Sequence, residues 1–297
     1  MLIRCQFSHN FKFNTNINNF GIYNIHCVVD HFIIVESIYN HKGEKRNLQF
    51  DINKFKKFER KIIYIVNDDA PNNLKKIKEN DTEDEKSDKY ILNAILRENG
   101  QRNSIVRGLD RADNNDLILI SDVDEIPNLS SVDLKKINKK IIFFNQFFFY
   151  YKFNLYQPGI TWVGTKGCKK KDLINPQWLR NIKDRIYPIW RIDTIFSKTK
   201  YNSIEIVKNG GWHFSNIKSA SSIHLKLKSY LHHREFDEES LTVQEIKNKI
   251  NNKQAIYDLR ADKRENKVGK GPILEKFDIK ELPNYIQKNI EVYKEWM

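Results

Sequence analysis

The sequence predicts an α/β protein built on a largely parallel central sheet, and three observations indicate this fold class. Short β-branched and aromatic segments, typical of strands, alternate with segments whose apolar residues recur at helical spacing. The segment LILIS, residues 117–121, lacks the apolar–polar alternation of a half-exposed strand, which indicates a strand buried on both faces. No internal repeat and no Gly-, Ser- or Pro-rich linker divides the 297 residues. Because strands alternating with helices form parallel sheets, one large domain is expected.

The first half of the chain supplies further strands and helices on either side of LILIS. Strands are expected at 26–37 and 61–66, where β-branched and aromatic residues predominate. Apolar residues at helical spacing lead up to Gly100, which interrupts the pattern, and a second helix is expected over 101–112. The segment 130–140, SSVDLKKINKK, has Ser and Asp near its start and is expected to form a capped helix.

The second half begins with the most aromatic segment of the chain. Residues 141–154, IIFFNQFFFYYKFN, predict two strands or one strand that kinks near Asn145. Loops are expected over 156–172 and 180–193, where glycine, proline and charged residues interrupt any regular period.

The last third combines a strand, a glycine turn and helices. The strand IEIV at 204–207 leads into the tight turn GGWHFS at 210–215, and 217–236 is expected to be a helix. The remaining pattern is charged and weakly amphipathic. We therefore expect one α/β domain over 1–240 and a helical C-terminal extension over 241–297, packed on or near the same domain.

Composition excludes several classes of protein. Hydrophobic content of 40% and aromatic content of 12% are typical of a folded chain. Cys5, Cys27 and Cys168 are too scattered for a disulfide framework or a CxxC metal knuckle, which favours a reducing compartment. The N-terminus lacks the apolar stretch of a signal peptide, and no segment approaches ~18 uncharged apolar residues. We expect a soluble, cytoplasmic protein of a microbe or virus, without a transmembrane segment.

The net charge is strongly positive, with 51 Lys and Arg against 38 Asp and Glu and a formal value of +13. Such a chain attracts an anionic partner, whether nucleic acid, a membrane surface or a phosphorylated small molecule. The alternative is drift, because the chain is rich in Lys, Asn and Ile, as expected of an AT-rich coding sequence. Charge alone does not choose between these explanations.

Three carboxylates within four positions follow LILIS, in the segment DVDEIP. Asp122, Asp124 and Glu125 repel one another, so a positive partner is expected beside them. Side chains at the carboxyl end of a buried parallel strand project into the crevice where α/β proteins bind ligands, and alternation sends Asp122 and Asp124 to the same side. Two hard oxygen ligands on one side fit Mg²⁺ or Mn²⁺. The alternative is that these acids cap loops and pair with nearby lysines or arginines.

A histidine in GGWHFS is a second candidate ligand. The two glycines permit close backbone approach, which places His213 where it can complete the coordination of Mn²⁺ or hydrogen-bond a diphosphate. The alternative is an ordinary structural histidine. His232 and His233 form a third candidate, in a helical run that is equally compatible with the surface.

Six motifs occur in order: VVDHFIIVES, GQRNSIVRGL, LILISDVDEIP, FFFYYKFN, WVGT and GGWHFSNIKSASSIHLKLKSY. HKGEKRNLQF follows the first motif and HHREF follows the last, so the likeness runs from about residue 22 to 236. With these motifs the chain resembles glycosyltransferase family 17. That family comprises the β-1,4-mannosyl-glycoprotein β-1,4-N-acetylglucosaminyltransferases and their microbial and viral relatives. DVDEIP and GGWHFS are the most specific of the six.

The resemblance implies a GT-A-like nucleotide-sugar fold, a divalent cation (Mn²⁺ or Mg²⁺) and transfer with inversion at the anomeric carbon. It also implies UDP-N-acetylglucosamine as the donor and a glycan as the acceptor, with no nucleic-acid partner. In this likeness Asp124 is the direct metal ligand, with Asp122 nearer the ribose or a water-mediated ligand, and His213 closes the metal site. The residues matched to nucleotide binding are Arg102, Asn103 and Lys226, the last at the diphosphate.

Transfer with inversion also needs a base that takes the proton of the attacking hydroxyl. Glu125, next to the acid pair, is the first candidate, Glu235 in HHREF is its rival, and Asp193 is a weaker one. Trp162 and Trp212 can stack on sugar or nucleotide rings, or can simply fill the core.

Two other classes of function compete with this interpretation. A metal-dependent phosphatase of the haloacid dehalogenase kind also places a DxD motif after a hydrophobic strand, with Asp122 as nucleophile, but its motif does not continue as Glu–Ile–Pro. A basic nucleic-acid-binding protein would interleave aromatic and basic residues on one surface. Here the aromatic residues cluster instead in apolar, strand-like runs.

Overall fold

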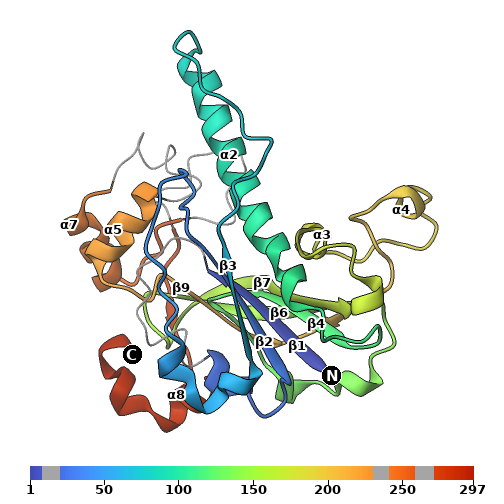
Figure 1. The fold of residues 1–297 in the computed structure, drawn as a ribbon. Coiled ribbons are helices and arrows are strands. Elements are labelled where there is room, and N and C mark those ends of the chain that lie inside the picture. The colour runs from blue at the N-terminus through green and yellow to red at the C-terminus, as the bar shows by residue number, and fades with distance from the viewer. Residues whose placement is uncertain (9–20, 230–240, 258–270) are drawn as a thin grey trace.

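A ten-stranded mixed sheet organises the computed structural model, which describes residues 1–8, 21–229, 241–257 and 271–297 (Figure 1). Within these residues the strands lie in the order β3-β2-β1-β4-β7-β6-β9-β5, with β10 beside β7 and β8 beside β6. The strands are β1 (Leu2–Ser8), β2 (His31–Ser37), β3 (Ile62–Asn67), β4 (Leu117–Asp122), β5 (Glu125–Pro127), β6 (Ile141–Tyr150), β7 (Leu155–Lys169), β8 (Ile204–Val207), β9 (Gly211–Ser215) and β10 (Glu275–Lys276).

The sheet has a parallel half and a mixed half. Strands β3, β2, β1 and β4 are all parallel, whereas β7 is antiparallel to both β4 and β6. Strands β8 and β9 then run parallel to β6, and β5 is antiparallel to β9. Most strand pairs are therefore parallel, and the predicted α/β class is confirmed.

Helices and short 3₁₀ segments cover the sheet. The α-helices are α2 (Glu83–Asn103), α3 (Pro176–Asn181), α4 (Asp193–Phe196), α5 (Ala220–Ser229), α7 (Val243–Asn251) and α8 (Asn284–Lys288), and the longer 3₁₀ segments are η1 (Ile52–Lys61), η2 (Ser104–Gly108) and η7 (Ile290–Trp296). Figure 1 shows α2 standing out above the sheet and α4 carried on a separate projection. Among the described helices, none combines the length and apolarity needed to cross a membrane.

Strand β4 is buried on both faces, as the LILIS run predicts. Ile118 and Ile120 pack on one face with Ile105 of η2 and Leu179 of α3. Leu119 packs on the opposite face against the core that includes residues of η1. Because β4 is fixed from both sides, its carboxyl end is a rigid support for the acidic residues that follow.

The C-terminal residues pack on the same sheet. β10 pairs with β7, and Ile246 of α7 lies in a core cluster with residues of β6 and α5. Leu282 and Ile286 pack with Trp212 and Phe214 of β9. The division of the chain at residue 240 stays a prediction.

The expected loop over 156–172 is wrong, because most of it forms the long strand β7. A Cβ atom at Gly167 would lie too close to the side chain of Leu119, and one at Gly164 would overlap the side chain of Gln146. The glycines that suggested a loop therefore mark close approaches between strands.

Three smaller expectations also need correction. Helix α2 continues through Gly100, where a Cβ atom would meet only a proline side-chain atom at 3.6 Å, so this glycine does not break it. The expected helix over 130–140 is instead two short 3₁₀ turns at Leu129–Ser131 and Leu134–Lys136. Strand β2 begins at His31, later than expected. The kink predicted near Asn145 is confirmed by the shift of register beside it in β6.

Candidate active site

The acidic segment turns sharply where β4 ends. Asp122 is the last residue of β4, Val123 and Asp124 form a turn, and Glu125 begins β5. The extended chain therefore ends at Asp122, so the expected strand alternation does not continue to Asp124. The two carboxylates still lie close enough for the charge of Asp124 to raise the pKa of Asp122.

Strand β9 brings the histidine of GGWHFS to this turn. Glu125 lies opposite His213 in the β5–β9 ladder, and the backbone N–H of Phe214 donates to the Asp124 carbonyl at 2.9 Å. Gly211 has φ +138°, and a Cβ atom there would collide with the carbonyl oxygen of Ile126. The glycine is needed because only a residue without a side chain lets the two strands approach this closely.

Asp124 and His213 form a close pair. His213 Nε2 lies 3.3 Å from Asp124 Oδ2. Burial disfavours ionisation of Asp124, but the charge and hydrogen bond of His213 outweigh it and, together with Lys226, lower the pKa of Asp124 to about 2. Burial likewise opposes protonation of His213, and Asp124 in turn raises its pKa. Each group therefore holds the other in its charged form.

Aromatic rings fix the orientation of His213. The ring of Phe148 meets it edge-on at 4.8 Å between centroids, and Trp162 lies at 4.7 Å on a more parallel plane. His213 Nδ1 is buried and has no hydrogen-bond partner among the described residues. Trp162 thus forms a wall beside the histidine, with its indole N–H turned to Glu125.

Glu125 is fully buried and accepts hydrogen bonds from several directions. Arg180 Nη1 and Nη2 donate to its two carboxylate oxygens at 3.0 and 2.9 Å. Trp162 Nε1 donates at 2.9 Å and the backbone N–H of Asp122 at 2.8 Å. Burial raises the pKa of Glu125, but Arg180 overcomes this effect and lowers it. The Glu125 carboxylate therefore holds the side chains and backbone around it in place, which favours a positioning role over proton transfer.

Two arginines flank Asp122. Arg180 Nη2 lies 3.4 Å and Arg102 Nη2 3.7 Å from Asp122 Oδ1, which has no hydrogen-bond donor among the described residues. Burial raises the pKa of Asp122 above its usual range even though Arg180 acts against this, and Glu125 adds to the rise. The carboxylate still has 31% of its side chain accessible to water, so it faces an opening.

Two lysines approach Asp124 from the segment after β9. Lys226 Nζ donates to Asn216 Oδ1 at 2.7 Å, and both Lys226 and Lys218 interact electrostatically with Asp124. Burial lowers the pKa of both lysines, and the charge of Lys226 helps to bring Lys218 to about 7. Two partly desolvated ammonium groups beside one carboxylate form a site suited to an additional anion.

The QRN segment lies at the end of α2 and joins it to α3. Arg102 donates to Gln177 Oε1 and, at 2.7 Å, to Glu98. Asn103 Oδ1 accepts the backbone N–H of Gln177 at 3.0 Å. Arg102 thus reaches Asp122, whereas Asn103 holds the two helices together.

Other predicted site residues lie elsewhere. Trp212 precedes His213 in β9, so its ring lies on the opposite face of the sheet, where Nε1 donates to the Glu281 carbonyl at 3.0 Å. Asp193 belongs to α4 and pairs there with Arg191 and Lys200, at 2.7 Å in each case. The structure brings neither residue to the acidic turn. The remaining candidates lie outside the described residues: His232, His233 and Glu235.

The site offers a divalent cation two protein ligands. No three His, Cys, Asp or Glu side chains converge as a metal-binding group in the parts of the chain that the structure describes. Asp124 and His213 are a carboxylate and an imidazole within ion-pair distance, and both kinds of group serve as ligands of divalent metals in proteins. Ions that accompany nucleotides are commonly held by one or two carboxylates, with substrate phosphates and water completing the shell. The pair fits such an ion.

Sequence reasoning missed Arg180 and Lys218. Arg180 lies in the six-residue helix α3, within the motif-free sequence PQWLRN, and its partner Glu125 is 55 positions away. Lys218 follows directly after GGWHFSN, so its proximity to the candidate metal site could have been inferred from the sequence.

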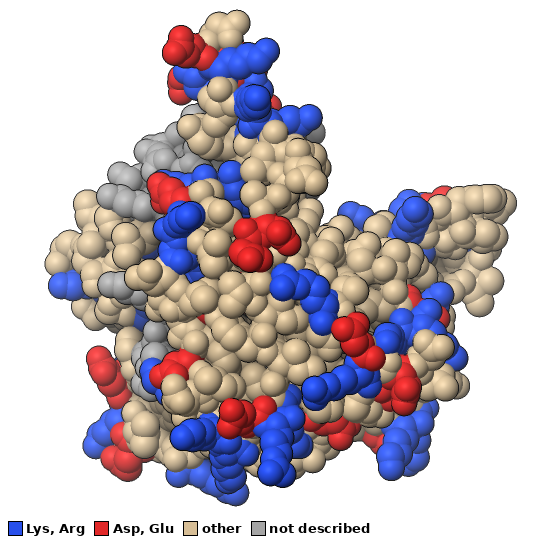
Figure 2. All heavy atoms as spheres, viewed as in Figure 1, with Lys and Arg blue, Asp and Glu red and all other residues tan. Residues whose placement is uncertain are grey.

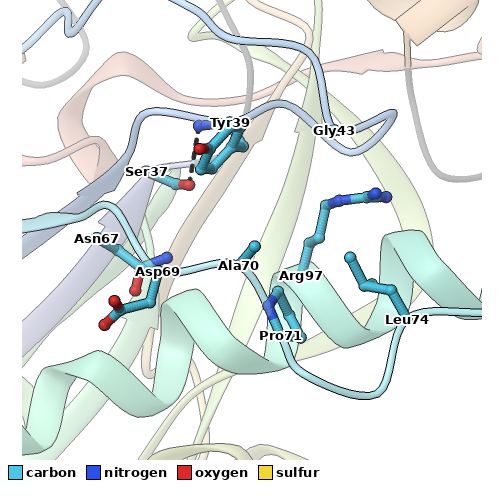
Figure 3. A pocket seen from close by; sticks show the side chains of 9 residues that line it. All are labelled: Ser37, Tyr39, Gly43, Asn67, Asp69, Ala70, Pro71, Leu74 and Arg97. Carbon is cyan, nitrogen blue, oxygen red and sulfur yellow. Dashed lines mark hydrogen bonds between the residues drawn. The ribbon is translucent and has the colours of Figure 1, made fainter.

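A second hollow lies at the carboxyl ends of β2 and β3, on the same edge of the parallel sheet. It encloses about 170 Å³ and is bounded by Ser37 and Asn67 at the strand ends, the ring of Tyr39, Asp69 and, from α2, Arg97 (Figure 3). Strand β1 alone separates β2 from β4, so the hollow and the acidic turn are on the order of 10 Å apart.

In open α/β sheets, ligands bind in the crevice outside the carboxyl ends of the parallel strands, and both the polar hollow and the acidic turn lie there. The sequence model of glycosyltransferase family 17 matches residues 11–171, which is more than half of the chain. The chain therefore belongs to this family and is a glycosyltransferase, rather than a phosphatase of the haloacid dehalogenase kind. No curated protein sequence matches it.

Solved structures show only distant likeness. A Bacillus anthracis protein, inferred to be a glucose-1-phosphate thymidylyltransferase, is 10% identical with a TM-score of 0.36, over 71% of this chain and 88% of that one. HddC from Yersinia pseudotuberculosis is 8% identical with a TM-score of 0.33, over 70% and 90%. Glucosyl-3-phosphoglycerate synthase from Mycobacterium tuberculosis, solved with Mn²⁺, UDP and phosphoglyceric acid, is 12% identical with a TM-score of 0.29, over 77% and 78%. At these scores the likenesses carry no functional conclusion.

The buried pair of Arg180 and Glu125 predicts a large effect of one substitution. Arg180→Met should lower the free energy of unfolding by about 3–5 kcal/mol, because Glu125 would stay buried without its cation. Arg191→Met, which breaks the solvent-exposed pair with Asp193, should lower it far less, because water already screens that pair. Urea denaturation of both variants measures the difference, and equal small losses would contradict the structural role of Arg180.

Proposed function

We propose that this glycosyltransferase is metal-dependent and transfers N-acetylglucosamine from UDP-N-acetylglucosamine to a glycan hydroxyl with inversion. The observation that carries the proposal is the pair of Asp124 and His213, 3.3 Å apart, beside two lysines with lowered pKa values. The choice of donor sugar and of a glycan acceptor rests on the family resemblance.

Asp124 and His213 would hold the cation in this proposal. Asp124 is ionised at any ordinary pH, and His213 presents its Nε2 to the same space. When bound, a divalent ion supplies positive charge that stabilises a departing diphosphate. Replacement of the proton on His213 by a metal would keep the charge beside Asp124 positive.

Lys218 and Lys226 would bind the diphosphate of the donor. Burial lowers the pKa of Lys218 to about 7, and an arriving anion would favour the charged form of this lysine, so its contact can strengthen as negative charge develops on the leaving group. Arg102 and Arg180 lie on the other side of the turn, 3.7 and 3.4 Å from Asp122 Oδ1, and hold that carboxylate in place.

The hollow between β2 and β3 would hold the nucleoside. The ring of Tyr39 offers a surface on which a planar base can stack, and Asn67 and Asp69 offer polar atoms for its edge. Its position two strands from β4 lets one nucleotide place its base in the hollow and its phosphates at the acidic turn.

In transfer with inversion, an acceptor oxygen bonds to the anomeric carbon as the bond to the diphosphate breaks, and a carboxylate takes the hydroxyl proton. Glu125 accepts bonds from Arg180, Trp162 and a backbone amide, so we assign it to positioning. Glu235 is then the remaining candidate for the base. Trp162, exposed in part beside His213, would form one wall of the sugar subsite.

The metal role of Asp124 is tested by Asp124→Asn. This variant should lose Mn²⁺-dependent binding of UDP, since a neutral amide neither neutralises the cation nor keeps His213 in place. Isothermal titration of UDP with and without Mn²⁺ measures the loss, with Asp110→Asn, at an exposed acid, as the control. Unchanged binding by a folded Asp124→Asn protein would refute the proposed function.

The anion-binding role of Lys218 is tested by Lys218→Met. The variant should weaken UDP binding by about tenfold or more, because a charge-assisted contact is lost. It should also raise the melting temperature, since a methionine avoids the desolvation that lowers the pKa of this lysine to about 7. Lys208→Met, at an exposed lysine, should change neither quantity. A lower melting temperature with unaltered UDP affinity would show that Lys218 is structural.

A further inference from the structure

Residues 183–200 form an arm that projects from the body of the protein. Its two limbs are joined at the base by backbone hydrogen bonds from Lys183 to Thr199 and from Tyr187 to Tyr201, of 2.8 and 3.1 Å. Figure 1 shows α4 at the outer part of this projection, well clear of the sheet. The arm follows directly after α3, the helix that carries Arg180 into the active site.

The tip of the arm exposes large apolar side chains to an unusual degree. Their exposed fractions lie between 71% and 82%: Ile189, Trp190, Ile192, Ile195 and Phe196. Scattered surface apolar residues are normal, but a contiguous group with two aromatic rings indicates a surface that contacts another apolar phase. In Figure 2 the projection is mostly tan, with blue lysine and arginine atoms toward its base.

The tip has a defined backbone conformation that holds these side chains outward. The backbone N–H groups of Arg191, Thr194 and Ile195 donate to carbonyls three residues earlier, at 3.0 to 3.1 Å. The Thr194 hydroxyl adds a bond to the Arg191 carbonyl. Because these hydrogen bonds hold the backbone of the tip in a turn, its apolar side chains cannot fold onto the core and stay exposed to water.

The charges around the tip are predominantly positive. The segment 183–200 contains five Lys or Arg and two Asp residues. Both acids are paired, Asp184 with Lys166 and Asp193 with Arg191 and Lys200. The arm that carries the apolar tip therefore has an excess of three positive charges.

We propose that this arm binds the surface of an anionic lipid bilayer, with the tip residues inserted among the lipid headgroups. Tryptophan favours the membrane–water interface, where its apolar ring is buried and its N–H stays hydrated, and phenylalanine and isoleucine supply apolar surface for insertion at the same level. The surrounding cations are attracted by anionic headgroups. A second copy of the chain fits less well, because it would carry the same positive charge to the contact.

The base of the arm is fixed to the active site. Lys166 Nζ donates to the carbonyls of Arg180 and Ile182, at 3.0 and 2.6 Å, and to Asp184 Oδ1 at 2.6 Å. One buried lysine thus secures both the end of α3 and the start of the arm. Lipid contact at the tip would hold the active site at a set distance from the bilayer, so its acceptor would be presented at a membrane surface. The membrane contact itself depends on neither the metal nor the donor sugar.

Vesicle flotation tests the proposal with the full chain, using phosphatidylcholine vesicles with and without phosphatidylserine. The wild-type protein should float only with the anionic vesicles, and less so as salt is raised. Trp190→Ser combined with Phe196→Ser should weaken binding by at least about tenfold, because two interfacial rings are lost. Val292→Ser removes another exposed apolar residue, far from the arm in sequence, and should bind as the wild type does.

A second measurement places the tip in the bilayer. Brominated phospholipid in the anionic vesicles should quench tryptophan fluorescence of the wild type, and Trp190→Phe should lose most of this quenching while it still floats. The proposal would be overturned if the wild type did not bind anionic vesicles, or if the variant with Trp190→Ser and Phe196→Ser bound them as well as the wild type does. The proposal would also be overturned if the wild type formed a dimer in gel filtration, and if Trp190→Ser with Phe196→Ser dissociated that dimer without any effect on flotation.

Discussion

The buried ion pair between Arg180 and Glu125 is the interaction on which the acidic turn depends. Three carboxylates within four positions would repel one another, and Arg180 contacts two of them from a helix 55 positions away. Glu125 in turn fixes Trp162 and the backbone of Asp122, and Trp162 stacks beside His213. Arg180 therefore supplies part of the positive charge expected next to these acids, and Asp124 pairs with His213 instead.

Lys218 and Lys226 lie near Asp124 and His213 in an arrangement that favours ligand binding over stability. Two lysines lie close enough together, and far enough from water, for burial to lower their pKa values. Burial of two ammonium groups opposes folding, and in the proposed function an arriving diphosphate would offset this cost. The arm beyond α3 has a similar character, because apolar side chains that contribute nothing to the core are held in water.

The sequence predicted those features of the fold and site that depend on neighbouring residues. LILIS followed by DVDEIP predicted a buried strand with acids at its end, and GGWHFS predicted a close backbone approach near a histidine. The sequence did not predict β7, because Gly164 and Gly167 lie where residues distant in the chain approach the strand closely. Arg180 was not predicted for the same reason, because the acids that it contacts are also distant in the chain. Alternation in β9 could have separated Trp212 from His213, had GGWHFS been interpreted as a strand instead of a turn.

In the proposed function, the turn after β4 and the histidine of β9 together hold a divalent ion that binds a nucleoside diphosphate. A crystal structure of the protein with Mn²⁺ and UDP, with anomalous data collected for manganese, tests it most directly. We predict an anomalous peak between Asp124 and His213, with the diphosphate between that peak and Lys218. A complex in which UDP is bound but manganese is absent from that position, with Asp124 still paired to an uncoordinated His213, would contradict the claim.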